Sequence, residues 1–261
     1  MRVRRYRAGG AQAPVVALVD GDSLGTVDGS SVARDLGVPL LAVMLPPRRD
    51  DCALRLRVFT MARELPLSLE AAWAARAALD GDVVVELGVT GTRVGVRDGL
   101  FVADVPRPVL EGRPVDDPAA AARALGIDPS VLDPEAPVRT GSCGLGVLVV
   151  PVLGHAAGRA ARLDATAWAA FVGKAKLVGA LVASTATPRL DATFVPAPGA
   201  GDGWAPALAM VPWALARGPS GGDALHEDVS LRTLNGGAAR FSLSRDGTGA
   251  WRAEASVVSV D

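Results

Sequence analysis

The 261-residue sequence contains few of the side chains that build metal, redox or triad chemistry. It has two cysteines, Cys52 and Cys143, and two histidines, His155 and His226, each pair widely separated. Two thiols in a chain of this size argue against a disulfide framework, and no Cys/His spacing is typical of a zinc site. We therefore expect neither a metal nor a cofactor. We interpret both histidines as surface or helix-end residues.

Long hydrophobic runs and an excess of one charge are also missing. No apolar stretch is long enough to span a bilayer. The arginines that follow Met1 lead into a small, Gly-rich segment rather than a signal core. The formal net charge is -1, and the scattered charges give no footprint for nucleic acid or an anionic membrane. The sequence predicts a soluble cytoplasmic protein that binds neither.

Hydrophobic residues, in contrast, make up 49% of the chain, enough for one large or two modest domains. Apolar or alternating runs predict strands at 15–19, 40–45, 53–60 and 145–152. The segments 69–79 and 205–217 predict helices that are apolar on nearly every side, so each must be buried all round. Because the order of strands, apolar helix and strands occurs twice, we predict two equivalent lobes with a cleft between them.

The Pro-rich segment 106–118 is the best linker candidate. We place the N-terminal lobe at 1–113 and the C-terminal lobe at 114–261, and we allow for a last strand that crosses back to the N-terminal lobe.

Several segments, in the same order along the chain, resemble the PhzF-like isomerases. The strongest is LRLRVFT at 54–60 followed by ELPL at 64–67. Weaker matches are DGDSL at 20–24, SCGL at 142–145, VVPV at 149–152 and the stretch 194–215. The resemblance implies the diaminopimelate epimerase-type α+β fold, in which each lobe is a curved, mostly antiparallel sheet around one central helix. It also implies a homodimer and a cofactor-independent proton transfer.

The residues that carry the family's chemistry are replaced in this chain. The family's catalytic Glu falls on Leu40, and its Gly-His-Pro segment falls on Leu69-Glu70-Ala71. At the second buried helix, its Asp falls on Gly203 and its Ser on Leu208. The scaffold pattern therefore survives while the usual site is rewritten.

Two acids are the candidate catalytic residues. Glu70 lies in the first turn of the first buried helix, where a carboxylate can act as a general base if burial raises its pKa. The alternative is ordinary complementarity to the helix dipole. Asp202 precedes the second helix, and its alternative is a loop or N-cap residue. Together they would form a facing pair, one from each lobe.

Candidate substrate-binding residues surround this cleft, and each has a structural alternative. Ser68 is also a helix N-cap, and Trp204 is also a core or interface aromatic. Cys143 is also an inert buried thiol. The full set is Ser68, Leu40, Leu69, Trp204, Ser142, Cys143 and Leu208.

We expect an isomerase that moves a proton or double bond on a small unsaturated amino or carboxylic acid, in antibiotic-type specialised metabolism. Two alternatives stay open. The loss of the family's polar residues also fits a catalytically silent protein that binds a metabolite or a protein partner. An apolar pocket would also suit a shape-selective cyclisation catalyst.

Overall fold

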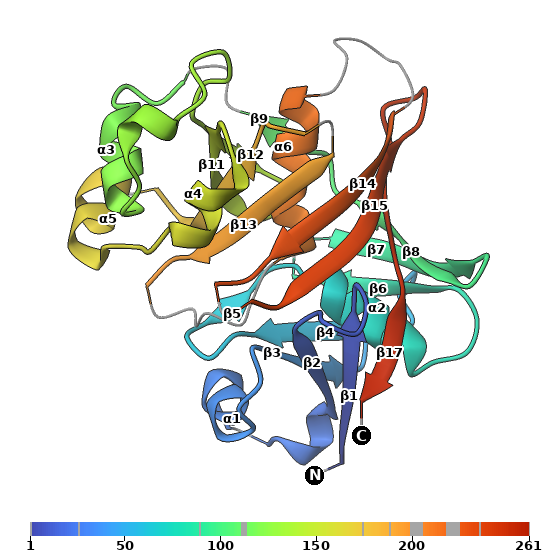
Figure 1. Cartoon of the computed structure of the whole chain (residues 1–261). Helices are drawn as coiled ribbons and strands as arrows, with labels where there is room; N and C mark the ends of the chain where they lie inside the picture. Colours follow the sequence, from blue (N-terminus) through green and yellow to red (C-terminus); the bar gives the residue numbers. More distant parts are fainter. Residues whose placement is uncertain are drawn as a thin grey trace.

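The computed structural model describes residues 2–25, 27–88, 90–110, 114–173, 175–187, 189–198, 206–217, 225–234 and 236–260. The chain forms an α+β fold with two lobes, one around helix α2 (Leu69–Ala77) and one around helix α6 (Met210–Arg217) (Figure 1). Most of its strand pairs are antiparallel. The predicted fold class is confirmed.

The N-terminal lobe holds the first eight strands. They are β1 (Val3–Ala8), β2 (Val15–Asp20), β3 (Leu40–Leu45), β4 (Leu54–Phe59), β5 (Glu64–Leu65), β6 (Val83–Leu87), β7 (Thr90–Arg97) and β8 (Leu100–Val105). The 3-10 turn η1 (Gly21–Ser23) and helix α1 (Gly29–Asp35) lie between β2 and β3.

The C-terminal lobe holds the later elements. Its strands are β9 (Val109–Leu110), β10 (Arg139–Ser142), β11 (Gly146–Val152), β12 (Leu177–Ser184), β13 (Leu190–Pro196), β14 (Leu225–Arg232), β15 (Ala238–Arg245) and β16 (Trp251–Ala255). Its helices are α3 (Pro118–Ala124), α4 (His155–Ala160) and α5 (Ala165–Val172), with 3-10 turns η2 (Pro129–Val131) and η3 (Ala207–Ala209). A last strand, β17 (Val257–Val260), follows β16.

The two lobes repeat one order of strand pairings. In the first, β2 and β3 are parallel across α1, β3 and β4 are antiparallel, and β4 and β6 are parallel across α2. In the second, β11 and β12 are parallel across α4 and α5, β12 and β13 are antiparallel, and β13 and β14 are parallel across α6. Each lobe then ends in an antiparallel meander. The buried helix is therefore the same crossover connection in both lobes.

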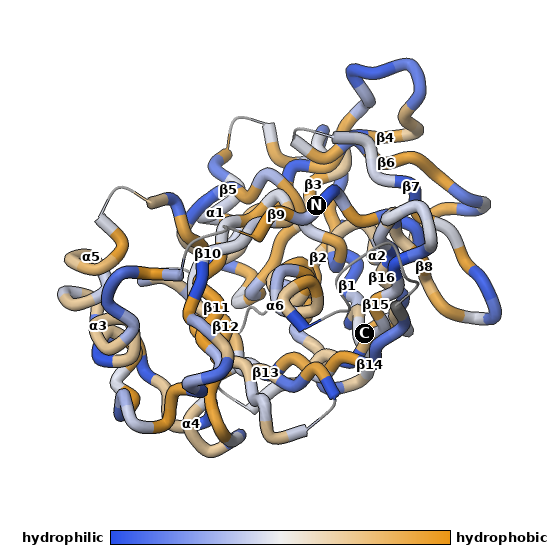
Figure 2. Tube along the Cα trace, turned by 90° about the horizontal axis from the view of Figure 1, so that it is seen from above, coloured by the Kyte–Doolittle hydropathy of each residue, from blue (hydrophilic) through white to orange (hydrophobic). Residues whose placement is uncertain are grey.

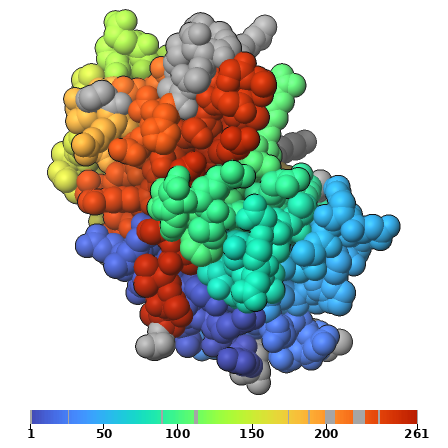
Figure 3. Space-filling model, turned by 90° about the vertical axis from the view of Figure 1, so that its right-hand side faces the viewer, coloured from blue at the N-terminus to red at the C-terminus, as the bar shows by residue number. Residues whose placement is uncertain are grey.

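Two strands join the sheet of the lobe from which they are more distant in sequence: β9 lies before residue 114 but joins the C-terminal sheet, and β17 lies at the end of the sequence but joins the N-terminal sheet. Strand β9 pairs with β10, and β17 pairs with β1, so Arg5 lies opposite Val260. Strands β8 and β16 join the two sheets, with Phe101 opposite Ala255. Figure 3 shows the red C-terminal strands against the green segment that contains β7 and β8. The lobes thus form one continuous network of strands.

Helix α2 is held by its cap and by the burial of its side chains. Ser68 is its N-cap, as predicted, because the Ser68 hydroxyl accepts a hydrogen bond from the Ala71 amide at 3.2 Å. Every residue from Leu69 to Ala75 is buried, and Trp73 is fully enclosed. The lobe therefore packs its sheet around the helix on all sides.

The second buried segment is one predicted helix but two elements in the structure. It begins with the 3-10 turn η3 and continues as α6. Pro212 explains the division, because proline cannot donate to the carbonyl of residue 208 and its ring crowds that carbonyl. Figure 2 shows α6 end on, with strands around it.

Two further features were not predicted from the sequence. One is helix α4, because six residues with no apolar period give no signal. The other is the division of residues 251–260 into β16 and β17, where the pairing changes at Ser256. Its carbonyl accepts a hydrogen bond from the Gly9 amide at 2.8 Å. Before Ser256, β16 pairs with β8, and after it β17 pairs with β1.

Candidate functional site

Glu70 connects the beginnings of the two buried helices. Its Oε2 accepts a hydrogen bond of 2.6 Å from the Ser68 hydroxyl, within the first turn of α2. Its Oε1 accepts a hydrogen bond from the amide of Ala207, the first residue of η3 in the other lobe. Pro206, the N-cap of η3, supplies no side-chain cap. The carboxylate from one lobe therefore takes the place of a capping group in the other.

Burial sets the protonation behaviour of Glu70. The residue is only 7% exposed. Loss of solvent raises the pKa of its carboxyl group, while hydrogen bonds from Ser68, from Ala207 and from its own amide act in the opposite direction. The net shift is upward from the ordinary value of 4.5. A buried carboxyl group with a raised pKa keeps its proton to a higher pH than an exposed one, which suits a group that both accepts and returns a proton.

The turn between β10 and β11 closes the site from the C-terminal lobe. Gly144 has a φ of +76°, and a Cβ there would lie 2.5 Å from Cδ2 of Leu67. Leu67 directly precedes Ser68, so this turn packs against the chain that leads into α2. Only glycine accommodates both the backbone conformation and the close approach.

Cys143 lies in this turn as a protonated thiol. Its side chain is fully buried, and Sγ donates to the carbonyl of Pro106 at 3.0 Å. Burial raises the pKa of Cys143 to about 12, so almost no thiolate forms near neutral pH. The neighbouring Ser142 is half-buried and pairs with Gly146 and Val109 in the sheet.

The apolar candidates lie inside the main hydrophobic core. Leu40, Leu69 and Leu208 are each at most 1% exposed and belong to the cluster that contains both buried helices. The structure thus brings together Ser68, Glu70 and the start of η3, and it places the three leucines in the hydrophobic core of the two lobes. Asp202 and Trp204 lie outside the described residues, so the facing pair of acids stays a prediction.

Glu64, in the segment that resembles the family's ELP motif, has a surface role. It forms a two-pronged ion pair with Arg57, with both N–O distances 2.8 Å. Both side chains are about half exposed, so the ion pair contributes little stability. It joins the paired strands β4 and β5.

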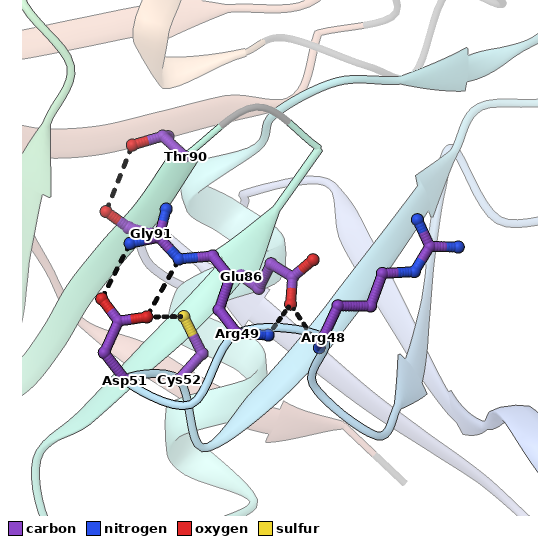
Figure 4. A network of polar contacts seen from close by, with 7 residues as sticks. All are labelled: Arg48, Arg49, Asp51, Cys52, Glu86, Thr90 and Gly91. Atoms are coloured by element: carbon purple, nitrogen blue, oxygen red, sulfur yellow. Dashed lines mark hydrogen bonds and ion pairs between the residues drawn. The ribbon is translucent and has the colours of Figure 1, made fainter.

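Glu86 is the other buried carboxylate among the described residues, and its role is structural (Figure 4). It accepts hydrogen bonds from the backbone amides of Arg48 at 2.7 Å and Arg49 at 3.3 Å. Arg49 in turn pairs with Asp51, which also accepts from the Cys52 thiol at 3.6 Å. This network fixes the loop between β3 and β4, away from Glu70.

The sequence could not reveal the partner of Glu70. That partner is a backbone amide, which every residue except proline carries, so residue type gave no signal. The Leu67–Gly144 contact was missed for a similar reason, because it depends on how the lobes meet. In the part of the chain that the structure describes, no helix has the length and apolar character to cross a membrane.

Neither a protein-family model nor a curated protein sequence matches the chain. Solved structures do. A PhzF-family phenazine biosynthesis protein from Bacillus anthracis superposes with a TM-score of 0.77 at 14% identity, over 100% of this chain and 98% of that one. A predicted epimerase from Pseudomonas aeruginosa gives 0.76 at 20% identity, over 99% and 97%.

A hydroxyproline epimerase from Agrobacterium vitis, solved with trans-4-hydroxy-L-proline bound, gives a TM-score of 0.60 at 10% identity, over 100% and 91%. These similarities show that the chain has the PhzF-like fold that the sequence resemblance implied. Epimerases of amino acids share this architecture.

Proposed function

We propose that this protein is a cofactor-independent isomerase or epimerase that acts on a small amino or carboxylic acid, with Glu70 as its acid–base group. One observation carries the proposal: a deeply buried carboxyl group with a raised pKa lies between the first turns of the two central helices. Proton-transfer enzymes without cofactors need a group of this kind. The family resemblance supports the same reaction type.

The chemistry assigns a defined step to Glu70. As a carboxylate it takes a proton from one carbon of the unsaturated substrate. The electron pair of that C–H bond forms a new double bond, and the pair of the existing double bond moves to a second carbon. The protonated Glu70 then returns the proton to that second carbon, so it ends as it began. Ser68 holds one oxygen in place throughout, since its hydroxyl donates to Oε2.

The Ala207 amide suggests which group the substrate carries. While Glu70 accepts from this amide, its Oε1 is occupied. A substrate carboxylate can replace Glu70 there, because amides at the start of a helix suit an anion. That exchange would free Oε1 for the reacting carbon. A small unsaturated acid of specialised metabolism, a cytoplasmic location and a homodimer complete the proposal.

Deuterium exchange tests the proposal. Purified protein is incubated in D2O with a panel of unsaturated small amino acids and carboxylates, alongside Glu70→Gln. Glu64→Gln is the matched control, because it removes an exposed carboxylate four residues before Ser68, the N-cap of α2. We expect deuterium to enter one compound with wild type and Glu64→Gln, but not with Glu70→Gln. Equal incorporation by wild type and Glu70→Gln would remove Glu70 from the mechanism.

A second function, binding without catalysis, has its own observation. Both oxygens of Glu70 accept hydrogen bonds from the chain's own groups, and Leu40, Leu69 and Leu208 are buried in the core. In this case Glu70 would serve only to join the lobes. Saturable binding of a panel compound, with no deuterium incorporated by wild type, would favour this function over isomerisation.

A further inference from the structure

A cavity lies beside the last turns of α6. It has a volume of about 270 Å³ and is lined by the last turns of α6 together with residues of β9 and β11. Trp213, which lines it, is six residues after Ala207, or about 9 Å along a helix axis. The cavity is therefore separate from the site at the first turn of η3.

Trp213 forms part of the wall of this cavity. The residue is 2% exposed, and its Nε1–H is buried without a hydrogen-bond partner among the described residues. Because this N–H is shielded from solvent, Trp213 contributes apolar surface to the cavity. Trp73 has an equally unpaired indole in the other lobe, but it packs against Phe241 instead of lining a cavity of this kind.

Two arginines add positive charge to the same cavity. Arg139 of β10 is half-buried and makes no ion pair within the described chain. Arg217 lies over the Trp213 ring, with its guanidinium carbon 5.6 Å from the ring centre. Its Nη1 donates to the carbonyls of Thr187 and Arg189 at 3.1 and 3.3 Å, which fixes its position. The negative end of the helix dipole is offset by these charges.

The remaining walls are mainly apolar. Val149, Pro151 and Leu110 form them, and Thr185 contributes a hydroxyl that already donates to the Val152 carbonyl at 3.1 Å. Glu135 is exposed at the edge. A larger cavity of about 500 Å³ on the outer face of β14 to β16 differs in character, because its three arginines are balanced by three acids. The smaller cavity is rich in donors and so selects for an anion.

We propose that this cavity is a binding site for a small organic anion with an apolar body, such as an aromatic monocarboxylate. Its carboxylate would accept from the Arg139 guanidinium, with Arg217 contributing charge. Its apolar part would lie against Val149 and Pro151. This site does not depend on Glu70 or on catalysis.

Indole resonances provide the test. The Trp213 N–H signal in a ¹H–¹⁵N spectrum is identified by its loss in Trp213→Phe, and benzoate is then titrated into wild type. We expect a saturable shift of this signal, because the bound ligand would lie against Trp213. Benzamide, which has the same shape without the charge, should bind at least about tenfold more weakly, a difference of about 1.4 kcal/mol.

Variants separate this site from the one at Glu70. We expect Arg139→Gln to weaken benzoate binding about tenfold. Arg159→Gln, which changes an exposed arginine of α4, should bind as wild type does. The Trp213 shift should persist in Glu70→Gln. The proposal is overturned by the absence of a saturable shift, by equal binding of benzamide, or by equal binding in Arg139→Gln and Arg159→Gln.

Discussion

The carboxylate of Glu70 and the amide of Ala207 form a hydrogen bond that joins the two lobes at the beginnings of their central helices. The bond spans 137 residues of sequence and is buried. Burial of the same carboxyl group outweighs its hydrogen bonds, so the stability of the protein depends on the protonation of Glu70. The pKa of Glu70 is raised in the folded state.

The stability contribution of Glu70 should therefore fall as pH rises. It is fully present below 4.5, the ordinary pKa of the group, and is lost progressively as pH rises through the raised folded-state pKa. Glu70→Gln keeps the shape and cannot ionise, so its free energy of unfolding should lack this decline. Glu70→Ala should lose about 2–4 kcal/mol, because it leaves the Ala207 amide unpaired and opens a cavity.

Denaturant titrations of the three proteins at pH 4, 6 and 8 check this prediction. The free-energy difference between Glu70→Gln and wild type should move in favour of Gln as pH increases. A difference that stays constant across the range would contradict a raised pKa for Glu70.

The contact between the turn at Gly144 and Leu67 predicts that alanine destabilises the protein more at Gly144 than at Gly99. Gly144 and Gly99 have similar positive φ values, +76° and +79°. A Cβ at Gly144 would meet Leu67, whereas at Gly99 nothing lies within 4 Å. Both alanine variants place a residue with a Cβ at positive φ, which costs about 1 kcal/mol of stability. Gly144→Ala also brings this Cβ too close to Leu67. We expect the melting temperature to fall clearly further for Gly144→Ala, and equal losses would argue against this packing.

The loop anchored by Glu86 should be sensitive to the loss of its charge. Glu86→Gln retains the size of the side chain but weakens its bonds to the Arg48 and Arg49 amides. We expect a loss of about 1–2 kcal/mol in the free energy of unfolding. Asp51→Asn, in the exposed ion pair of the same loop, should change stability little. Hydrogen exchange of these two amides would show whether Glu86 holds them.

Both cysteines should be unreactive in the folded protein. Burial raises the pKa of Cys143 to about 12 and also raises that of Cys52. With so little thiolate at pH 8, Cys143 should react with a disulfide reagent about a thousandfold more slowly than an exposed thiol. Stopped-flow labelling with and without denaturant checks this. Rapid labelling of Cys143 in the native protein would show that the turn opens.

The fold was predictable because its strongest signals are local. Apolar residues on every side of 69–79 and 205–217 required buried helices, and Ser68 identified a helix start. The repeated order of elements then indicated two lobes. The site was harder, because Glu70 could be selected by residue type but its Ala207 partner depends on tertiary placement. Pro212 and Ser256 show the same limit, since each divides an element that composition alone presents as continuous.

The pairing of β1 with β17 has a consequence for synthesis in the cell. Arg5 finds its partner only when Val260 has left the ribosome. Until then the first strand of the nascent chain has one exposed hydrogen-bonding edge, and such edges invite aggregation. Completion of the N-terminal sheet therefore waits until β17 has been synthesised, and it rests on contacts of very high sequence separation, which fold slowly. We expect a ribosome-stalled chain that ends before residue 257 to be more sensitive to protease than the released protein.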